Sequence, residues 1–138
     1  MSAAKAFVDS NVLLYLLSAN KAKAERAEEI IGAGASISVQ VLNEVANVAR
    51  RKLHMSWPES TELLTLLRAV CTAEPLTIET HMRGLDVAQR YKLSVYDAMI
   101  AASALLAGCE KLYSEDMQDG LLIDDRLRVC NPFLGTSS

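Results

Sequence analysis

Features that would direct this chain to a membrane are missing from the sequence. The apolar stretch at residues 7–17 is interrupted by Asp9 and Asn11, and it is far shorter than the roughly 20 residues that a membrane-spanning helix needs. No secretory signal peptide is visible at the N-terminus. We therefore expect a cytoplasmic protein that has no contact with a membrane.

The chain also lacks any cysteine motif. Its three cysteines, Cys71, Cys109 and Cys130, are odd in number, widely spaced and not paired with histidine. A zinc site or a redox pair normally shows closely spaced Cys-x-x-Cys or Cys/His ligands. Small hydrophobic residues in a reducing compartment are the favoured interpretation of all three.

An excess of positive charge is missing as well. The formal net charge is −3, so no global basic field draws the protein onto nucleic acid. A nuclease is not excluded, because a metal-binding site needs acids and only a local basic rim. With 138 residues, 51% apolar and 22% charged, and without repeats or linkers, residues 1–138 are expected to form one globular domain.

Strands and helices alternate along the sequence, and helices predominate. The strands are expected at residues 4–8, 35–38, 74–78, 111–114 and 128–130, with 74–78 at a sheet edge because it contains a proline. The helices are expected at residues 12–17, 21–31, 39–53, 58–70, 80–91 and 96–106. This alternation predicts a small α/β sandwich with a mostly parallel sheet.

Four carboxylates stand where apolar runs enter the core. They are Asp9, Glu44, Asp97 and Asp116. An ionised carboxylate near a core costs several kcal/mol unless another group compensates it. A hard divalent cation, held by oxygen ligands from across the sequence, would compensate all four at once.

Ordinary explanations exist for three of these acids. Asp9 suits the N-cap of the helix that follows it. Asp97 lies three residues after Ser94, the spacing of a capping box, and Asp116 could be a solvated loop acid. Glu44 resists such explanations, because it lies inside a helix, close to the buried stripe, and has no charged residue four positions on.

The ordered set of these motifs resembles the PIN domain, and specifically the VapC-like ribonuclease toxins of toxin–antitoxin pairs. The segments that carry the resemblance are 7–15, 41–47, 96–104, 112–120 and 131–133. Together they extend from about Phe7 to Phe133, nearly the whole chain. The resemblance implies a three-layer α/β sandwich, in which helices flank a short, mostly parallel central sheet.

The resemblance also implies the residues of the site. Carried over by position, the acids that bind metal are Asp9, Glu44, Asp97 and Asp116. The supporting polar residues are Asn11, Ser114 and, as a possible extra acid, Asp119. Many relatives have Thr where this chain has Ser114, and the loop after it varies. Whether Asp116 or Asp119 completes the site therefore stays open.

One or two Mg²⁺ ions, with Mn²⁺ as a possible substitute, would activate water against an RNA phosphodiester. The resemblance implies products with a 5′-phosphate and a 3′-hydroxyl. No histidine is needed, and we expect His54 and His81 at the surface. The best candidates for binding RNA are Arg50, Arg51 and Lys52, and Arg90 with Lys92 is a weaker pair. A solvated helix end is an equally good explanation of the first cluster.

Partners follow from the resemblance: an RNA substrate, a small antitoxin that blocks the acidic site, and a second copy in a homodimer. The apolar segments Val12 to Leu17 and Leu63 to Val70 could form the grooves for a partner, or could simply pack in the core. Two alternatives remain, an RNA-processing nuclease outside a toxin–antitoxin pair and a PIN-like module that binds RNA or protein without cutting. A receiver domain is disfavoured, because only one acid follows the first strand.

Overall fold

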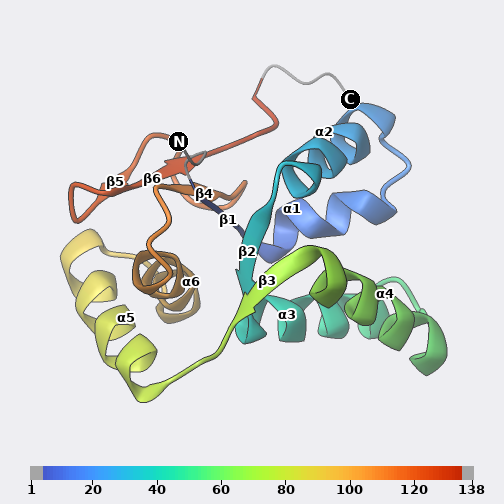
Figure 1. The fold of residues 1–138 in the computed structure, drawn as a ribbon, viewed down its shortest axis with the longest axis horizontal. Helices are drawn as coiled ribbons and strands as arrows, with labels where there is room; N and C mark the ends of the chain where they lie inside the picture. Colours follow the sequence, from blue (N-terminus) through green and yellow to red (C-terminus); the bar gives the residue numbers. More distant parts are fainter. Residues whose placement is uncertain (1–4, 135–138) are drawn as a thin grey trace.

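A six-stranded sheet with helices on both sides forms the protein (Figure 1), whose computed structural model describes residues 5–134. The strands are β1 (Ala6–Val8), β2 (Ala35–Ser38), β3 (Cys71–Glu74), β4 (Lys111–Tyr113), β5 (Leu122–Ile123) and β6 (Leu127–Cys130). The helices are α1 (Ser10–Leu14), α2 (Lys21–Gly32), α3 (Val39–Arg51), α4 (Trp57–Val70), α5 (Ile78–Tyr91) and α6 (Val95–Leu106), with a 3-10 turn η1 at Tyr15–Leu17.

The sheet has the order β3-β2-β1-β4-β6-β5. All neighbouring strands are parallel except the last pair, β5 and β6. The first strand therefore lies inside the sheet, where Phe7 is aligned with Ser36 on β2 and Leu112 on β4. This arrangement confirms the predicted α/β class and the mostly parallel sheet.

The helices form two outer layers. Figure 1 shows α1 to α4 on one side of the sheet and the pair α5 and α6 on the other. Fully buried residues of the central strands, such as Phe7, Ile37 and Leu112, form the core between the layers. The expected three-layer sandwich is therefore present.

Small residues let α6 pack tightly. Ala98, Ala101 and Ala102 are fully buried. On the facing helix, a Cβ atom at Gly84 would lie 2.4 Å from the sulfur of Met99. The glycine thus permits a close approach of α5 and α6, which helps to fix the start of α6 near the sheet.

The expected strand at residues 74–78 is wrong in position. The edge strand is β3, which ends at Glu74, and α5 begins at Ile78. Pro75 has no N–H to donate to a ladder, and the Thr77 side chain accepts a hydrogen bond from the backbone of Thr80 as the N-cap of α5. Both features end the strand before the segment that the sequence suggested.

Other differences are smaller. Strand β5 lies in a region for which no strand was predicted, and several helices begin one or two residues before their predicted starts. Cys71 and Cys109 are buried, Cys130 is partly buried and all three are free thiols. His54 and His81 are exposed, as expected. None of the helices among residues 5–134 has the length and hydrophobicity of a membrane span.

Candidate metal and active site

The predicted site lies at the carboxyl ends of the two central strands. Asp9 directly follows β1, and Ser114 directly follows the neighbouring parallel strand β4. Glu44 reaches this edge from the middle of α3, and Asp97 reaches it from the first turn of α6. In open parallel sheets, ligands bind at this end of the strands.

Asp9 is the most buried member, with only 3% of its surface exposed. Its Oδ1 atom accepts a hydrogen bond from the Ser10 amide at 2.7 Å, so it also serves as the N-cap of α1. Its Oδ2 atom accepts from Ser114 Oγ at 2.8 Å and from Asn11 Nδ2 at 3.2 Å. The capping and site interpretations of this residue are therefore compatible.

The pKa of Asp9 is raised to about 6. Burial is the main cause, because it disfavours the charged carboxylate. Hydrogen bonds from Ser114 and Ser10 lower the pKa, while the negative charges of Glu44 and Asp97 raise it. In the absence of a cation, the site thus holds this carboxylate at an energetic cost.

Glu44 has only neutral partners. Ser10 Oγ donates to Glu44 Oε1 at 3.0 Å, and it lies 3.5 Å from Asp9 Oδ1. Burial raises the pKa of Glu44, hydrogen bonds with Ser10 and Gln40 lower it, and the charges of Asp97 and Asp116 raise it. No cation among residues 5–134 forms a salt bridge with this carboxylate.

Asp97 occupies the third position of α6, whose N-cap is Ser94. The Ser94 hydroxyl accepts a hydrogen bond from the Asp97 amide at 3.2 Å. Burial is the first cause that raises the pKa of the Asp97 carboxyl, and the charge of Asp116 adds to it, while a hydrogen bond with Ser94 lowers it. Asp97 is therefore held by the helix start but is not itself the cap.

The two loop acids have different surroundings. Asp116 Oδ2 accepts from Asn11 Nδ2 at 3.0 Å, and the same amide contacts Asp9. Asp119 Oδ1 instead accepts from the backbone amide of Asn131 at 2.7 Å. The structure thus joins Asp116 to the other acids through Asn11, while Asp119 holds the chain that follows β6.

Oxygen donors alone make up this cluster. Mg²⁺ and Mn²⁺ prefer such donors, whereas zinc sites usually include nitrogen or sulfur. Across residues 5–134, no three His, Cys, Asp or Glu side chains converge into a preformed metal site. Mg²⁺ keeps several water ligands and needs only one or two protein carboxylates. The donor set therefore suits a hydrated cation that keeps several of its water ligands better than a fully protein-coordinated ion.

Two polar residues of the site were not predicted. Ser10 links Asp9 to Glu44, and Gln40 lies one helical turn before Glu44 on α3. The four-residue spacing between Gln40 and Glu44 was readable in the sequence. Ser10 gave no signal, because its contact with Glu44 depends on how α1 and α3 pack.

The basic residues at the end of α3 divide into two kinds. The Arg50 guanidinium lies 4.3 Å from the centre of the Trp57 ring and donates to the Met55 carbonyl. Arg51 and Lys52 are exposed. Arg51 is seven residues from Glu44, about two helical turns, so both lie on one face of α3.

The weaker basic pair has other roles. Arg90 forms salt bridges with Asp86 at 2.8 Å and with Asp124 at 2.6 Å. Lys92 ends α5 in a left-handed conformation with φ of 56°. Arg51, Lys52 and Lys92 are all exposed and form no salt bridge among residues 5–134. Of these, Arg51 shares a face of α3 with Glu44.

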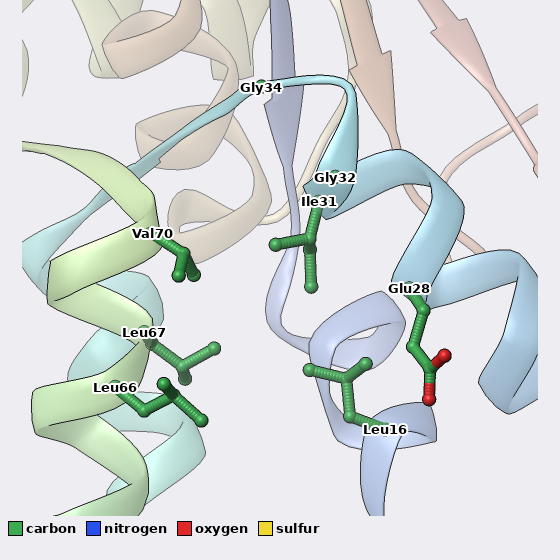
Figure 2. Close-up of a pocket in the computed structure, with 8 residues that line it drawn as sticks. All are labelled: Leu16, Glu28, Ile31, Gly32, Gly34, Leu66, Leu67 and Val70. Carbon is green, nitrogen blue, oxygen red and sulfur yellow. The ribbon is translucent and has the colours of Figure 1, made fainter.

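A separate apolar hollow lies between α4 and the α2–η1 region. Figure 2 shows Leu66, Leu67 and Val70 of α4 facing Leu16 and Ile31 across it. Its volume is about 530 Å³. Leu66 and Val70 are exposed, whereas Leu67 is buried. The apolar segment Leu63 to Val70 therefore contributes both to a surface groove and to the core.

Comparisons with known proteins agree with this architecture. A family profile described as the PIN domain matches residues 6–118. A toxin–antitoxin complex from Klebsiella pneumoniae has a similar structure, with a TM-score of 0.71 and 25% identity, over 93% of this chain and 98% of that one. None of the curated proteins matches the sequence.

Two further solved structures share the fold at lower identity. One is VapC20 of Mycobacterium tuberculosis, described as a toxin that cleaves the sarcin-ricin loop (TM-score 0.66, 20% identity, 81% of this chain and 90% of that one). The other is FitAcB from Neisseria gonorrhoeae (TM-score 0.62, 15% identity, 93% and 98%).

Proposed function

Because this chain belongs to the PIN domain family, we propose that it is a divalent-metal-dependent endoribonuclease and the toxin of a toxin–antitoxin pair. The observation that carries the proposal is the gathering of Asp9, Glu44, Asp97 and Asp116 around one edge of the sheet. Each of the first three has a raised pKa, and burial is the first cause in every case. Such a cluster is costly to keep unless it binds a cation.

We assign Asp9, Glu44, Asp97 and Asp116 as the residues that hold Mg²⁺, with Mn²⁺ as a substitute. Held by these carboxylates, such an ion would supply polarisation of the scissile phosphodiester and a lower pKa for the attacking water. Asn11 and Ser114 are positioning residues, since their side chains donate to Asp9 at 3.2 and 2.8 Å. The proposal needs no histidine, and His54 and His81 lie at the surface.

The RNA backbone follows the exposed face of α3 in this proposal. Arg51 and Lys52 bind phosphates about two helical turns from Glu44, while Arg50 supports them from its place on Trp57. Phosphate contacts of this kind give affinity and register but little sequence choice. They also compensate locally for the negative overall charge.

The apolar hollow of Figure 2 is the proposed binding site of the antitoxin. Leu16, Leu66 and Val70 present the kind of groove into which an amphipathic helix lays its apolar face. The similar complex from Klebsiella pneumoniae contains a toxin with its antitoxin. Replacing exposed Leu66 with Glu should release the partner while leaving RNA cleavage intact.

A second copy of the chain is proposed to cover α5. Ile78, Met82 and Leu85 follow helical spacing, and all three are exposed. An apolar stripe of this kind on the outside of a helix is typical of an interface. A Met82→Asp variant should sediment as a monomer if this stripe joins two copies, and as the wild-type species if it does not.

Metal-dependent cleavage of RNA is the decisive test. Wild-type protein should cut single-stranded RNA in Mg²⁺ or Mn²⁺, and EDTA should stop the reaction. Asp9→Asn and Asp97→Asn should each abolish cleavage while the far-UV circular dichroism stays unchanged. Glu25→Gln, an exposed acid on α2, is the matched control and should cut normally. Equal activity of the wild type and the two site variants would sink the assignment.

The outcome also separates the alternatives. A protein that binds RNA and metal but does not cut is a non-catalytic PIN module. A nuclease whose gene lies beside no short reading frame for a DNA-binding protein with a basic tail serves RNA processing instead. Co-purification with such a small protein supports the toxin–antitoxin assignment.

A further inference from the structure

A hollow between α3 and α6 shares one wall with the acid cluster. Its volume is about 410 Å³. The residues that line it are Gln40, Asn43, Glu44, Asn47, Leu76 and Tyr96. Glu44 belongs to both places, and Tyr96 directly precedes Asp97 in the chain. Whatever occupies this hollow therefore lies immediately beside the proposed cleavage site.

We propose that this hollow binds one unpaired nucleobase of the RNA substrate, next to the phosphate that is cut. Tyr96 stacks on the face of the base, and the amides of Asn43 and Asn47 read its edge. The inference rests on the proposed nuclease function and deepens it, because it names the residues that choose the cleavage sequence.

Tyr96 forms the aromatic side of the hollow, with an exposed ring and a backbone held by a hydrogen bond. Tyr96 is 69% exposed, and no aromatic or cation–π contact engages its ring within residues 5–134. Gln40 Nε2 donates to the Tyr96 carbonyl at 3.1 Å, which ties α3 to the start of α6. Proteins that bind single-stranded RNA use exposed aromatic faces of this kind as stacking platforms.

The polar wall consists of two amides on one helix face. Asn43 and Asn47 are four residues apart on α3, so their side chains are neighbours. Both are exposed, and neither amide has a hydrogen-bond partner among the described residues. An amide can donate and accept at once, which suits the mixed donor and acceptor edge of a base.

The chemistry of the hollow favours a neutral, planar occupant. Glu44 places a carboxylate in one wall, which repels a second phosphate. Leu76 contributes an exposed apolar side chain, which suits the flat face of a base. The stripe proposed for the second copy of the chain lies on α5, whereas the amides and the tyrosine belong to α3 and α6. A nucleobase therefore fits the aromatic, amide, acidic and apolar side chains that line the hollow.

Binding to modified RNA tests the pocket without cleavage. The protein is full-length Asp9→Asn, which should not cut, and the probes are fluorescent RNA hexamers in which one abasic position moves along the strand. At one position, loss of the base should weaken binding on the order of tenfold, the scale of one stacked base. Adding Tyr96→Ala should cause a similar loss with intact RNA, and the abasic RNA should then lose nothing further. Tyr96→Phe should behave like tyrosine.

Additive losses of RNA affinity would overturn the inference. If Tyr96→Ala and the abasic site weaken binding independently of each other at every position, the base does not lie on Tyr96. A Tyr96→Ala protein that changes from dimer to monomer on sedimentation also refutes it, because a second copy then covers the ring.

Cleavage by otherwise wild-type protein gives the second readout. RNAs that differ only in the base beside the cut bond should be cleaved at different rates by the wild type. In Asn43→Ala or Asn47→Ala these rates should become similar, while cleavage itself persists. If both variants cut RNA at the wild-type rate and with an unchanged base preference, Asn43 and Asn47 do not read the edge of the base. The stacking on Tyr96 is then judged by the binding experiment alone. Absence of any wild-type cleavage defeats the proposed nuclease function instead, and the binding experiment still decides the pocket.

Discussion

Replacing Asp9 with Asn should stabilise the metal-free protein at neutral pH while it removes activity. The carboxyl is almost fully buried, and its pKa in the folded protein is about 6, against an ordinary value of 3.8. A difference of about two pKa units corresponds to about 3 kcal/mol between the charged and neutral forms. The folded protein therefore bears this cost whenever Asp9 is ionised.

The direction of the pH dependence follows from the raised pKa. Below pH 3.8, Asp9 is protonated in both the folded and unfolded chains and contributes no difference. As the pH rises towards 6, the unfolded chain ionises first, so the free energy of unfolding falls by up to about 3 kcal/mol and then stays level. The amide side chain of the Asp9→Asn variant carries no charge at any pH, so this particular loss of stability is absent from the variant.

The substitution also has a cost. An Asn side chain can still accept from the Ser10 amide as the N-cap, but its NH₂ group replaces the oxygen that accepts from Ser114 and Asn11. The lost hydrogen bonds offset roughly 1 kcal/mol of the gain. The net stabilisation should be about 2 kcal/mol above pH 6.

Thermal unfolding in EDTA measures the effect. For a chain of this length, about 2 kcal/mol corresponds to a rise in Tm of roughly 7 °C at pH 7.5. The difference between variant and wild type should shrink steadily as the pH falls towards 4. With saturating Mg²⁺ only the wild type should gain stability, since a ligand that binds the folded state alone stabilises it.

Two results would refute this reasoning. If Asp9→Asn lowers Tm sharply at pH 7.5, the N-cap and Ser114 contacts outweigh the repulsion and burial of the charge. If the difference in Tm is the same at pH 4 and pH 7.5, the cost of the ionised carboxylate is not its source. Glu25→Gln should leave Tm unchanged throughout.

Three further predictions concern single residues. Ser114→Ala removes a hydrogen bond that lowers the pKa of Asp9, so this pKa should rise further, which an NMR titration of the carboxyl carbon detects. Arg51→Ala should reduce the slope of log K against log salt for RNA binding by about 0.7, the share of one phosphate contact, whereas exposed Lys21→Ala on α2 should leave the slope unchanged. Leu67→Ala, at a core position that is 2% exposed, should cost about 2–5 kcal/mol in urea unfolding, and the same change at exposed Leu66 should cost much less.

The sequence predicted the architecture because local patterns and the overall fold agree in most segments. The short apolar run before Asp9 favoured a buried strand, and the apolar spacing around Glu44 favoured a helix with one buried face; β1 and α3 confirm both. Alternating strands and helices then leave a parallel sheet as the economical solution. The edge strand was displaced because Pro75 and the capping Thr77 compete with strand formation just where the apolar residues continue.

The polar connections of the site were beyond the sequence. Ser10 meets Glu44 across 34 positions, and Asn11 joins Asp9 to Asp116 across more than 100. Such contacts depend on the angle between α1 and α3 and on the course of the loop after β4. The different contacts of the two loop acids were unpredictable for the same reason: Asp116 contacts the Asn11 amide, and Asp119 contacts the backbone amide of Asn131. The assignment of Asp116 to the site is part of the proposed function.

Neutral side chains explain how these acids can lie close together without a cation. Ser10, Asn11 and Ser114 each donate a hydrogen bond to the carboxylates at 2.8 to 3.2 Å, and none of them adds a positive charge that would compete with a metal ion. A lysine or arginine in their place would neutralise the cluster and occupy it permanently. Hydrogen bonds from neutral donors lower the cost of the charges only in part, as the pKa of about 6 at Asp9 shows. The cost that remains comes from burial and from the repulsion between the carboxylates. In the proposed function a bound divalent cation would relieve it, so the same burial and repulsion that limit the stability of the metal-free fold would favour affinity for the metal.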